Sequence, residues 1–145
     1  MHHLTKWDER WLELAATVAT WSKDQSTKVG CIIIDPEHRT VVSLGYNGAP
    51  RGVDEIHTRP EKYAVMEHAE RNAIYNAALR GTSTLGTHMY ITWFPCVDCA
   101  RAIIQAGVTR LVSPEPDFDA RPEWADSWTT AQTLLTTAGV DVTYA

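Results

Sequence analysis

The second half of the chain alternates helical and strand patterns, and this alternation constrains the fold more than any other sequence feature. Apolar residues recur every three or four positions in the helical stretches, and short apolar runs separate those stretches. In chain order we predict a helix at 67–80, a strand at 88–93, a helix at 97–106, a strand at 108–112, a helix at 122–138 and a strand at 140–144. Strands joined by helices pair in parallel with right-handed crossovers, so we expect parallel pairing in this half.

The first half of the chain adds antiparallel strands. Apolar side chains recur at helical spacing over residues 8–22, and two β-branched runs at 29–34 and 40–45 flank a short turn that favours a hairpin. The Gly-rich loop G-Y-N-G-A-P-R-G at 45–52 follows and cannot continue a strand. The predicted fold class is therefore α/β, with a three-layer α/β/α arrangement around a mixed sheet of about five strands.

The composition is that of a folded protein of ordinary domain size. The chain has 145 residues, of which 44% are hydrophobic and 21% charged, and it contains no repeat or linker, so we expect a single domain over 1–145. No apolar run approaches the ~20 residues that cross a bilayer, and the N-terminus lacks the apolar core of a signal peptide. We expect a cytoplasmic protein that binds no membrane, and we assign no role to His2 and His3.

The formal net charge of −5 bears on the class of substrate. Proteins that follow a nucleic-acid backbone usually carry a basic surface, whereas a nucleotide needs only one or two local cations. The charge favours a small-molecule substrate over nucleic acid.

The three cysteines divide into one structural and two chemical candidates. Cys31 lies in the apolar run V-G-C-I-I-I-D and is expected in the core. Cys96 and Cys99 form a C-x-x-C motif, and with three cysteines and no secretory signal a disulfide framework is not expected. A metal site or a redox pair remains possible for Cys96 and Cys99.

Two short motifs, His68-Ala69-Glu70 and Pro95-Cys96-Val97-Asp98-Cys99, each stand at the start of a predicted helix. Two cysteines three positions apart lie on one face of a helix, and the positive end of the helix favours thiolates. With His68 they give three ligands. Structural zinc usually has four protein ligands, whereas catalytic zinc keeps a position open for water and lowers the pKa of that water to about 7. Glu70 is then placed to move protons beside the metal.

Each motif alone is ambiguous. His68 could be a core histidine, Cys96 and Cys99 could be a redox pair, or the set could be a zinc-stabilised binding module without activity. Glu70 argues against the binding module, because a structural site needs no acid–base residue. The combination H-x-E and P-C-x-x-C is the known signature of zinc-dependent deaminases, so a zinc hydrolase is the preferred interpretation.

At these residues the chain resembles the cytidine deaminase-like superfamily and, more narrowly, the deoxycytidylate (dCMP) deaminases. The resemblance is carried by H-A-E-R-N-A-I-Y-N-A-A, by M-Y-I-T-W-F-P-C-V-D-C-A-R-A-I-I-Q-A-G-V-T-R-L-V, by S-T-K-V-G-C-I-I-I-D and by G-Y-N-G-A-P-R-G, and it covers roughly residues 10–113. It implies zinc-dependent hydrolysis of a free cytosine nucleotide, dCMP, to dUMP and ammonia. It also implies a homo-oligomer whose subunits complete each other's sites, and a possible deoxynucleoside triphosphate effector.

The resemblance further implies roles for individual residues. His68, Cys96 and Cys99 would hold Zn²⁺, and Glu70 would carry a proton from the zinc-bound water to N3 of the base and then to the leaving ammonia. The backbone N–H of Ala69 would hold the base O2, Asn47 would hydrogen-bond the sugar, and the carbonyl of Phe94 would accept from the 4-amino group. The segment from Gly52 to His68 is short and lacks cysteine, so no second structural zinc is expected.

Phosphate recognition has several candidates, namely Lys28, Arg51, Arg59, Lys62 and Arg71. We expect Arg51 to lead, because a loop beside the site can aim its side chain inward. An alternative function is a tRNA adenosine deaminase, or another nucleobase or nucleoside deaminase, which shares H-A-E and P-C-x-x-C. The acidic charge and the G-Y-N-G-A-P-R-G loop fit the tRNA enzyme less well.

Overall fold

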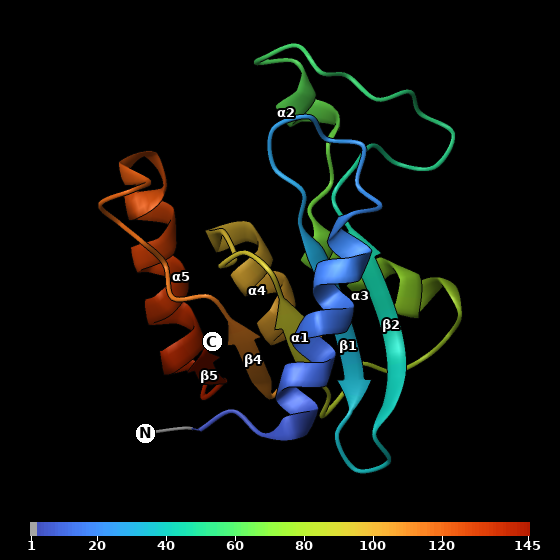
Figure 1. Ribbon diagram of the computed structural model, residues 1–145, viewed down its shortest axis with the longest axis vertical. Helices are drawn as coiled ribbons and strands as arrows, with labels where there is room; N and C mark the ends of the chain where they lie inside the picture. The colour runs from blue at the N-terminus through green and yellow to red at the C-terminus, as the bar shows by residue number, and fades with distance from the viewer. Residues whose placement is uncertain (1–2) are drawn as a thin grey trace.

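The computed structural model describes residues 3–145, so His2 lies outside the described residues. The elements in chain order are α1 Lys6–Ala19, β1 Gly30–Asp35, β2 Thr40–Tyr46, α2 Lys62–Val65, α3 Ala69–Leu79, β3 His88–Ile91, α4 Val97–Gln105, β4 Arg110–Ser113, the 3-10 helix η1 Pro122–Trp124, α5 Ala125–Thr137 and β5 Asp141–Tyr144. They form one five-stranded sheet with helices on both faces (Figure 1). Within the described chain, no helix is both long enough and apolar enough to span a membrane.

The sheet has the strand order β2-β1-β3-β4-β5 and mixed pairing. β1 runs antiparallel to β2, as the predicted hairpin requires, and also antiparallel to β3. The pairs β3·β4 and β4·β5 are parallel, as the alternation of helices and strands predicts. The fold class predicted from sequence is confirmed. The antiparallel pairing of β1 with β3 joins the hairpin to the parallel half of the sheet.

Successive side chains of β1 point to opposite faces of the sheet and pack into the core on each side. Cys31 and Ile33 belong to the core cluster that includes residues of α3, α4 and α5, whereas Ile32 and Ile34 belong to the cluster formed with α1. All four side chains are buried, because both faces of β1 are covered. The prediction that Cys31 lies in the core is confirmed.

Several element boundaries differ from the sequence-based ones, for local reasons. The first helix begins at Lys6 rather than residue 8, because Thr5 and Asp8 form a capping box. It ends at Ala19 rather than residue 22, and the ring of Trp21 lies against Tyr46 instead. The predicted helix at 122–138 divides into η1 and α5, and the short α2 was not predicted because four residues show no helical period.

Close packing between β2 and α3 fixes the position of the helix that follows His68. A Cβ on Gly45 would lie 2.4 Å from the backbone nitrogen of Ala73 and 2.6 Å from the carbonyl oxygen of Ala69. The hydroxyl of Ser43 donates to the carbonyl of Ala73 at 2.6 Å. Gly45 therefore lets the two backbones approach closely, and the start of α3 is held against the sheet.

Candidate metal centre and substrate pocket

The structure brings His68, Cys96 and Cys99 to one point although 28 residues separate the first two. His68 is the N-cap of α3, Cys96 is the N-cap of α4, and Cys99 lies in the first turn of α4. The Sγ atoms of Cys96 and Cys99 each lie 3.4 Å from His68 Nδ1. Among residues 3–145, these three form the one group of His, Cys, Asp or Glu side chains whose ligand atoms cluster for a metal, within 4.8 Å of one another.

The chain positions these three side chains through backbone contacts. Glu67 pairs with Gly48 as an isolated bridge, which holds the segment before His68 extended and next to the Gly-rich loop. The backbone N–H of Cys99 donates to Cys96 Sγ at 3.5 Å, so the first turn of α4 orients both sulfurs. Ser127 of α5 accepts from the backbone N–H of Val97 at 2.9 Å. The beginning of α4 is therefore held by a bond within its own first turn and by a contact from α5.

The donor set fits a zinc ion. Tetrahedral zinc with bonds of about 2.3 Å to sulfur and about 2.0 Å to nitrogen separates its S and N ligand atoms by about 3.5 Å. The two observed separations of 3.4 Å match that value. Two sulfurs and one imidazole are ligands that zinc prefers, and three protein ligands leave a coordination position for water or substrate.

The charge states of the three groups are coupled. The hydrogen bond with Cys99, followed by that with His68, lowers the pKa of the Cys96 thiol to about 4. The pKa of the Cys99 thiol is raised by the hydrogen bond between Cys99 and Cys96 and by burial. The pKa of His68 is raised by the hydrogen bond between His68 and Cys96. Cys96 is therefore the sulfur that becomes a thiolate first, which is the form that binds metal.

Glu70 lies in the first turn of α3, next to this group. Its side chain is only 4% exposed, and burial raises the pKa of its carboxyl above the ordinary value. A carboxyl whose pKa is raised holds a proton more readily than an exposed one and can still give it up to a stronger base. This property suits an acid–base residue.

A pocket of about 460 Å³ opens onto the three ligand residues and Glu70. Its lining includes Asn47, residues within 24–29 and 59–66, Trp93 and residues within 121–124. His68, Ala69, Glu70, Phe94 and Cys96 also line it. The volume lies in the range of small-molecule sites, and the pocket combines aromatic side chains with a few polar groups.

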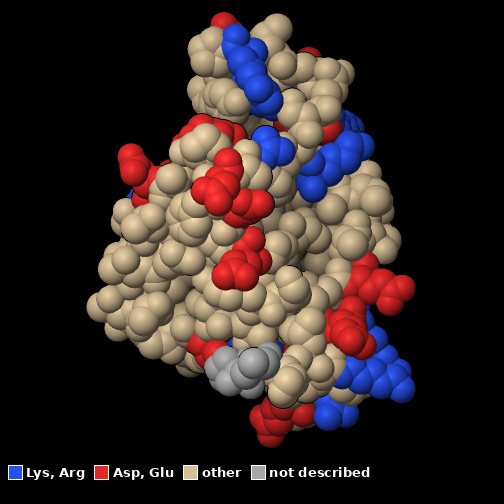
Figure 2. Space-filling view, turned by 60° about the vertical axis from the view of Figure 1, so that its left-hand side comes forward, with Lys and Arg blue, Asp and Glu red and all other residues tan. Residues whose placement is uncertain are grey.

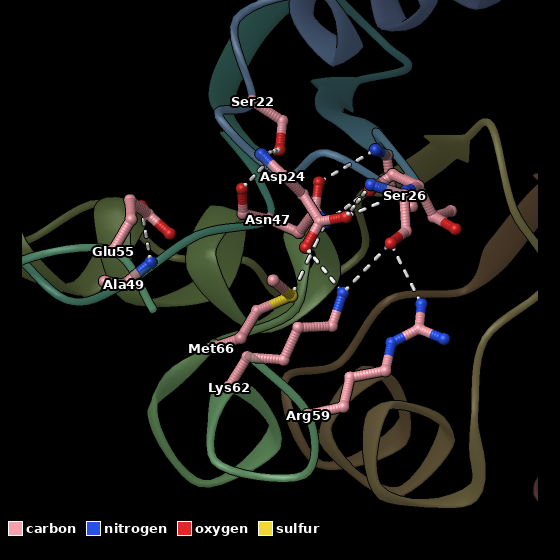
Figure 3. Close-up of polar contacts among 11 residues, drawn as sticks. Ser22, Asp24, Ser26, Asn47, Ala49, Glu55, Arg59, Lys62 and Met66 are labelled. Carbon is pink, nitrogen blue, oxygen red and sulfur yellow. Dashed lines mark hydrogen bonds and ion pairs between the residues drawn. The ribbon is translucent and has the colours of Figure 1, made fainter. Parts of the chain in front are cut away.

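The structure brings most of the candidate substrate residues to this pocket. Ala69 is the first residue of α3, so its N–H stands at a helix N-terminus. Phe94 is buried at the pocket floor. The Asn47 side chain accepts from Val29 N–H and donates to the Thr27 carbonyl, each at 2.8 Å, and so holds the loop before β1 at the pocket (Figure 3).

The basic candidates separate into two groups. Arg51 does not line the pocket, because its guanidinium donates to the side chain of Asn76 in α3. Arg71 of α3 pairs with Glu67, which precedes the helix, and neither Arg71 nor Lys28 is among the lining residues. Arg59 and Lys62 do line the pocket.

Sequence reasoning missed part of the pocket. Asp24 is buried in its wall, and Arg121 and Trp124 reach it from the tail of the chain. Nothing in the local sequence around Arg121 marks it as a site residue. Trp93 precedes Phe94 directly before the P-C-x-x-C motif, and that position could have indicated a place in the site.

Comparisons with known proteins agree with this geometry. Residues 5–114 match the family model for the cytidine and deoxycytidylate deaminase zinc-binding region. An uncharacterized deaminase of Aliivibrio fischeri is 38% identical over 144 residues, covering 97% of this chain and 95% of that protein. Human deoxycytidylate deaminase is 34% identical over 144 residues, covering 93% and 77%. The apo crystal structure of dCMP deaminase from cyanophage S-TIM5 has a TM-score of 0.77 at 26% identity, covering 97% and 98%.

Proposed function

The chain belongs to the cytidine and deoxycytidylate deaminase family, and we propose that it hydrolyses dCMP to dUMP and ammonia. The observation that carries this proposal is the buried Glu70 beside a three-residue zinc site at the floor of a nucleotide-sized pocket. The dCMP substrate is taken from the relatives that are named deoxycytidylate deaminases.

His68, Cys96 and Cys99 hold the zinc in this proposal. When bound, zinc acts as a Lewis acid that lowers the pKa of water to about 7, so that hydroxide is available at neutral pH. Because three protein ligands leave a coordination position open, the site is of the catalytic kind. Glu70 is not a ligand, and its carboxyl stays free to exchange protons.

Glu70 moves the protons of the reaction. It takes one proton from the attacking water and delivers it to N3 of the cytosine ring, while the water oxygen bonds to C4. It then takes the remaining proton from the hydroxyl on C4 and delivers it to the 4-amino group, which leaves as ammonia as the C4–N bond breaks and the C4 carbonyl forms. The raised pKa of the buried carboxyl supports both acceptance and return of the proton.

Residues around the floor orient the base and the sugar. The N–H of Ala69 donates to O2 of the base, and the carbonyl of Phe94 accepts from the 4-amino group. Asn47 contacts the sugar. Support for these roles is that all three residues line the pocket that holds Glu70.

A substrate panel tests the proposal. Ammonia release is measured with deoxycytidine, dCMP, deoxycytidine triphosphate and cytidylate, and with an adenosine-bearing RNA stem-loop. We expect the highest kcat/KM with dCMP. Release from the stem-loop, with none from the nucleotides, would overturn the proposal in favour of a tRNA adenosine deaminase.

Surface charge favours the nucleotide over the RNA. The net charge is −5, and on the face in Figure 2 the Lys and Arg side chains form separate small groups with acidic and uncharged surface between them. Binding of an RNA backbone usually requires a continuous basic surface.

We further propose that the chain is a single domain and that it works in the cytoplasm. We also propose that it forms a homo-oligomer whose subunits complete each other's sites, and that a deoxynucleoside triphosphate acts as an effector. Exposed aromatic side chains support assembly, since Trp21 and Tyr75 are 51% and 52% exposed and such residues are enriched at interfaces. Light scattering tests this point, and a particle of 16.2 kDa, the mass of one chain, would contradict it. Deamination rates with and without added triphosphate test the effector.

A further inference from the structure

Asn47 lines the pocket, and the chain fixes the orientation of its side chain (Figure 3). The residue is only 5% exposed. Its side-chain oxygen accepts from the Val29 N–H, and its amide nitrogen donates to the Thr27 carbonyl, each at 2.8 Å. Its backbone carbonyl accepts from the Ser22 hydroxyl, also at 2.8 Å. The amide of Asn47 therefore cannot turn over without breaking both of its side-chain hydrogen bonds.

One N–H of this amide has only a weak acceptor among the described residues. A primary amide carries two N–H groups, and the second contact of Asn47 Nδ2 is the thioether sulfur of Met66, at 3.6 Å. A thioether sulfur accepts hydrogen bonds weakly, so an oxygen atom of a ligand can take its place. Both residues line the pocket. Asn47 therefore offers one hydrogen-bond donor to a substrate, directly beside Met66.

The backbone around Met66 holds this side chain next to Asn47. The N–H of Met66 donates to the Lys62 carbonyl at 2.8 Å, at the end of α2. The next residue, Glu67, exchanges two backbone hydrogen bonds with Gly48, at 2.8 and 3.0 Å. Asn47 directly precedes Gly48 in the chain. The contact between Met66 and Asn47 is therefore set by the backbone as well as by the two side chains.

The chemistry of a deoxynucleotide identifies the group that this donor would bind. A 2′-deoxynucleoside 5′-phosphate has one free hydroxyl on its sugar, at C3′, and the proposed function places the sugar at Asn47. The N–H that faces Met66 then donates to O3′. Because C2′ is bonded to C3′, this pose brings C2′ next to the Met66 side chain, whose sulfur lies 3.6 Å from the same nitrogen.

We infer that Met66 selects 2′-deoxyribose over ribose by placing its thioether against C2′ of the sugar. The inference rests on the proposed function and names the residue that distinguishes the two sugars. The CH₂ group at C2′ of deoxyribose packs well against a flexible apolar side chain. The hydroxyl of ribose at the same place would lose water and gain only a weak sulfur acceptor.

Val29 is the competing apolar residue beside Asn47. It also lines the pocket, but its N–H bonds to the side-chain oxygen of Asn47, so it lies on the acceptor side of the amide. Met66 lies on the donor side, where the hydroxyl of the sugar would bind. Val29→Thr is therefore a matched control, because it adds a hydroxyl group with little change in size on the other side of Asn47.

The test compares the binding of dUMP and uridylate to the zinc-loaded chain by calorimetry. These ligands differ only at C2′, and neither carries the amino group that the reaction removes. The wild-type chain should bind dUMP roughly 10- to 100-fold more tightly, the range in which an apolar site rejects an added hydroxyl. Met66→Gln, which can hydrogen-bond the 2′-hydroxyl at a similar side-chain length, should lower that ratio by about 2- to 10-fold. Met66→Leu and Val29→Thr should leave the ratio close to the wild-type value.

A third ligand, 2′,3′-dideoxyuridylate, checks the contact with Asn47, because it lacks the 3′-hydroxyl. It should bind the wild-type chain about 2- to 10-fold more weakly than dUMP, the usual contribution of one hydrogen bond. Equal binding of these two ligands would overturn the inference, because the sugar would then not be held by the N–H beside Met66.

Equal affinity of the wild-type chain for dUMP and uridylate would also overturn the inference. So would an unchanged ratio in Met66→Gln, or a ratio that falls as far in Val29→Thr as in Met66→Gln. The assay measures binding without turnover. A chain that prefers dUMP through Met66 but releases no ammonia from dCMP would therefore contradict the proposed function and leave the role of Met66 standing.

Discussion

Cys96 and Cys99 differ from Cys31 in what surrounds the sulfur atom. Cys31 is fully buried in the core, where burial raises the pKa of its thiol well above the ordinary value. Cys96 and Cys99 instead face His68 at the start of a helix. The sequence already separates the C-x-x-C pair from the single Cys31, and the short distances to His68 favour a metal site over a redox pair.

This difference predicts the effect of removing each cysteine. Cys96→Ser and Cys99→Ser should each lose the zinc and much of the thermal stability, because binding of the metal contributes directly to folding free energy. Cys31→Ala should keep the zinc and lose only the packing of a small core side chain. Elemental analysis together with thermal melts checks both results. Full zinc content in either serine variant would contradict the assigned ligands.

At the scale of elements, the position of Glu70 depends on how closely α3 approaches β2. Gly45 lies under the first turns of α3, where an added Cβ would meet backbone atoms at 2.4 and 2.6 Å. Backbone cannot move aside as a flexible side chain does, so a methyl group at this position must displace the helix.

Gly45→Ala should therefore destabilise the protein by about 1–3 kcal/mol, the usual range for overpacking, and should reduce kcat by moving Glu70. Gly48→Ala is the control, since its Cβ would meet only the carboxylate end of Glu55, at 3.0 Å. Urea denaturation and ammonia release measure the two effects. Wild-type stability and rate in Gly45→Ala would show that α3 is not fixed by this contact.

Most elements could be predicted because their patterns are local. The hairpin, the parallel half of the sheet and the four longer helices follow from runs of apolar residues with period 2 or 3.6. The pairing of β1 with β3 joins residues about 60 positions apart, such as Cys31 and Ile91, and no local pattern specifies it. The short α2 is too brief to show a helical period.

The site was predictable where its residues belong to short motifs. His68, Glu70, Cys96 and Cys99 stand in two such motifs, and the structure brings them together. Asp24 and Arg121 do not, because what places them at the pocket is a buried ion pair and a ring contact between distant segments. Arg51 was favoured from its loop, but the direction of a side chain on a loop cannot be read from the sequence.

At the scale of the whole molecule, one polar network joins α1 to the centre of the sheet. Asp8 of α1 accepts from the Tyr90 hydroxyl at 2.6 Å and from Arg110 at 2.7 and 3.1 Å. Burial opposes ionisation of Asp8, but hydrogen bonds from Arg110, the Thr5 N–H and Tyr90 outweigh it and hold its pKa well below the ordinary value. The contacts span 82 and 102 residues along the chain.

The lowered pKa predicts the direction of acid sensitivity. The stability that ionised Asp8 contributes is fully present above its unfolded pKa of about 3.9, and it is lost as the pH falls toward the folded value. Asp8→Asn should lower the free energy of unfolding at neutral pH by about 3 kcal/mol, because it leaves Arg110 without its charged partner. It should also flatten the fall in stability below about pH 4. Denaturation series at several pH values check this, and an unchanged acid limb would contradict it.

We propose that Glu70 carries protons for hydrolysis at a zinc site to which it contributes no ligand. Glu70→Gln keeps the size of the side chain and its capacity to hydrogen-bond, but it cannot transfer the proton. The variant should stay folded and retain its zinc, which elemental analysis verifies before the assay. Acid–base catalysis contributes typically ~10²–10⁴-fold. In the proposed mechanism Glu70 serves more than one proton transfer, so the loss of rate should lie at or above the top of that range.

The deciding measurement is the rate of ammonia release from dCMP by zinc-loaded Glu70→Gln. We expect at least a ~10⁴-fold reduction relative to the wild-type chain. A rate close to that of the wild type would contradict the claim, and would direct attention to Glu67, whose carboxylate accepts from the His68 N–H at 3.0 Å.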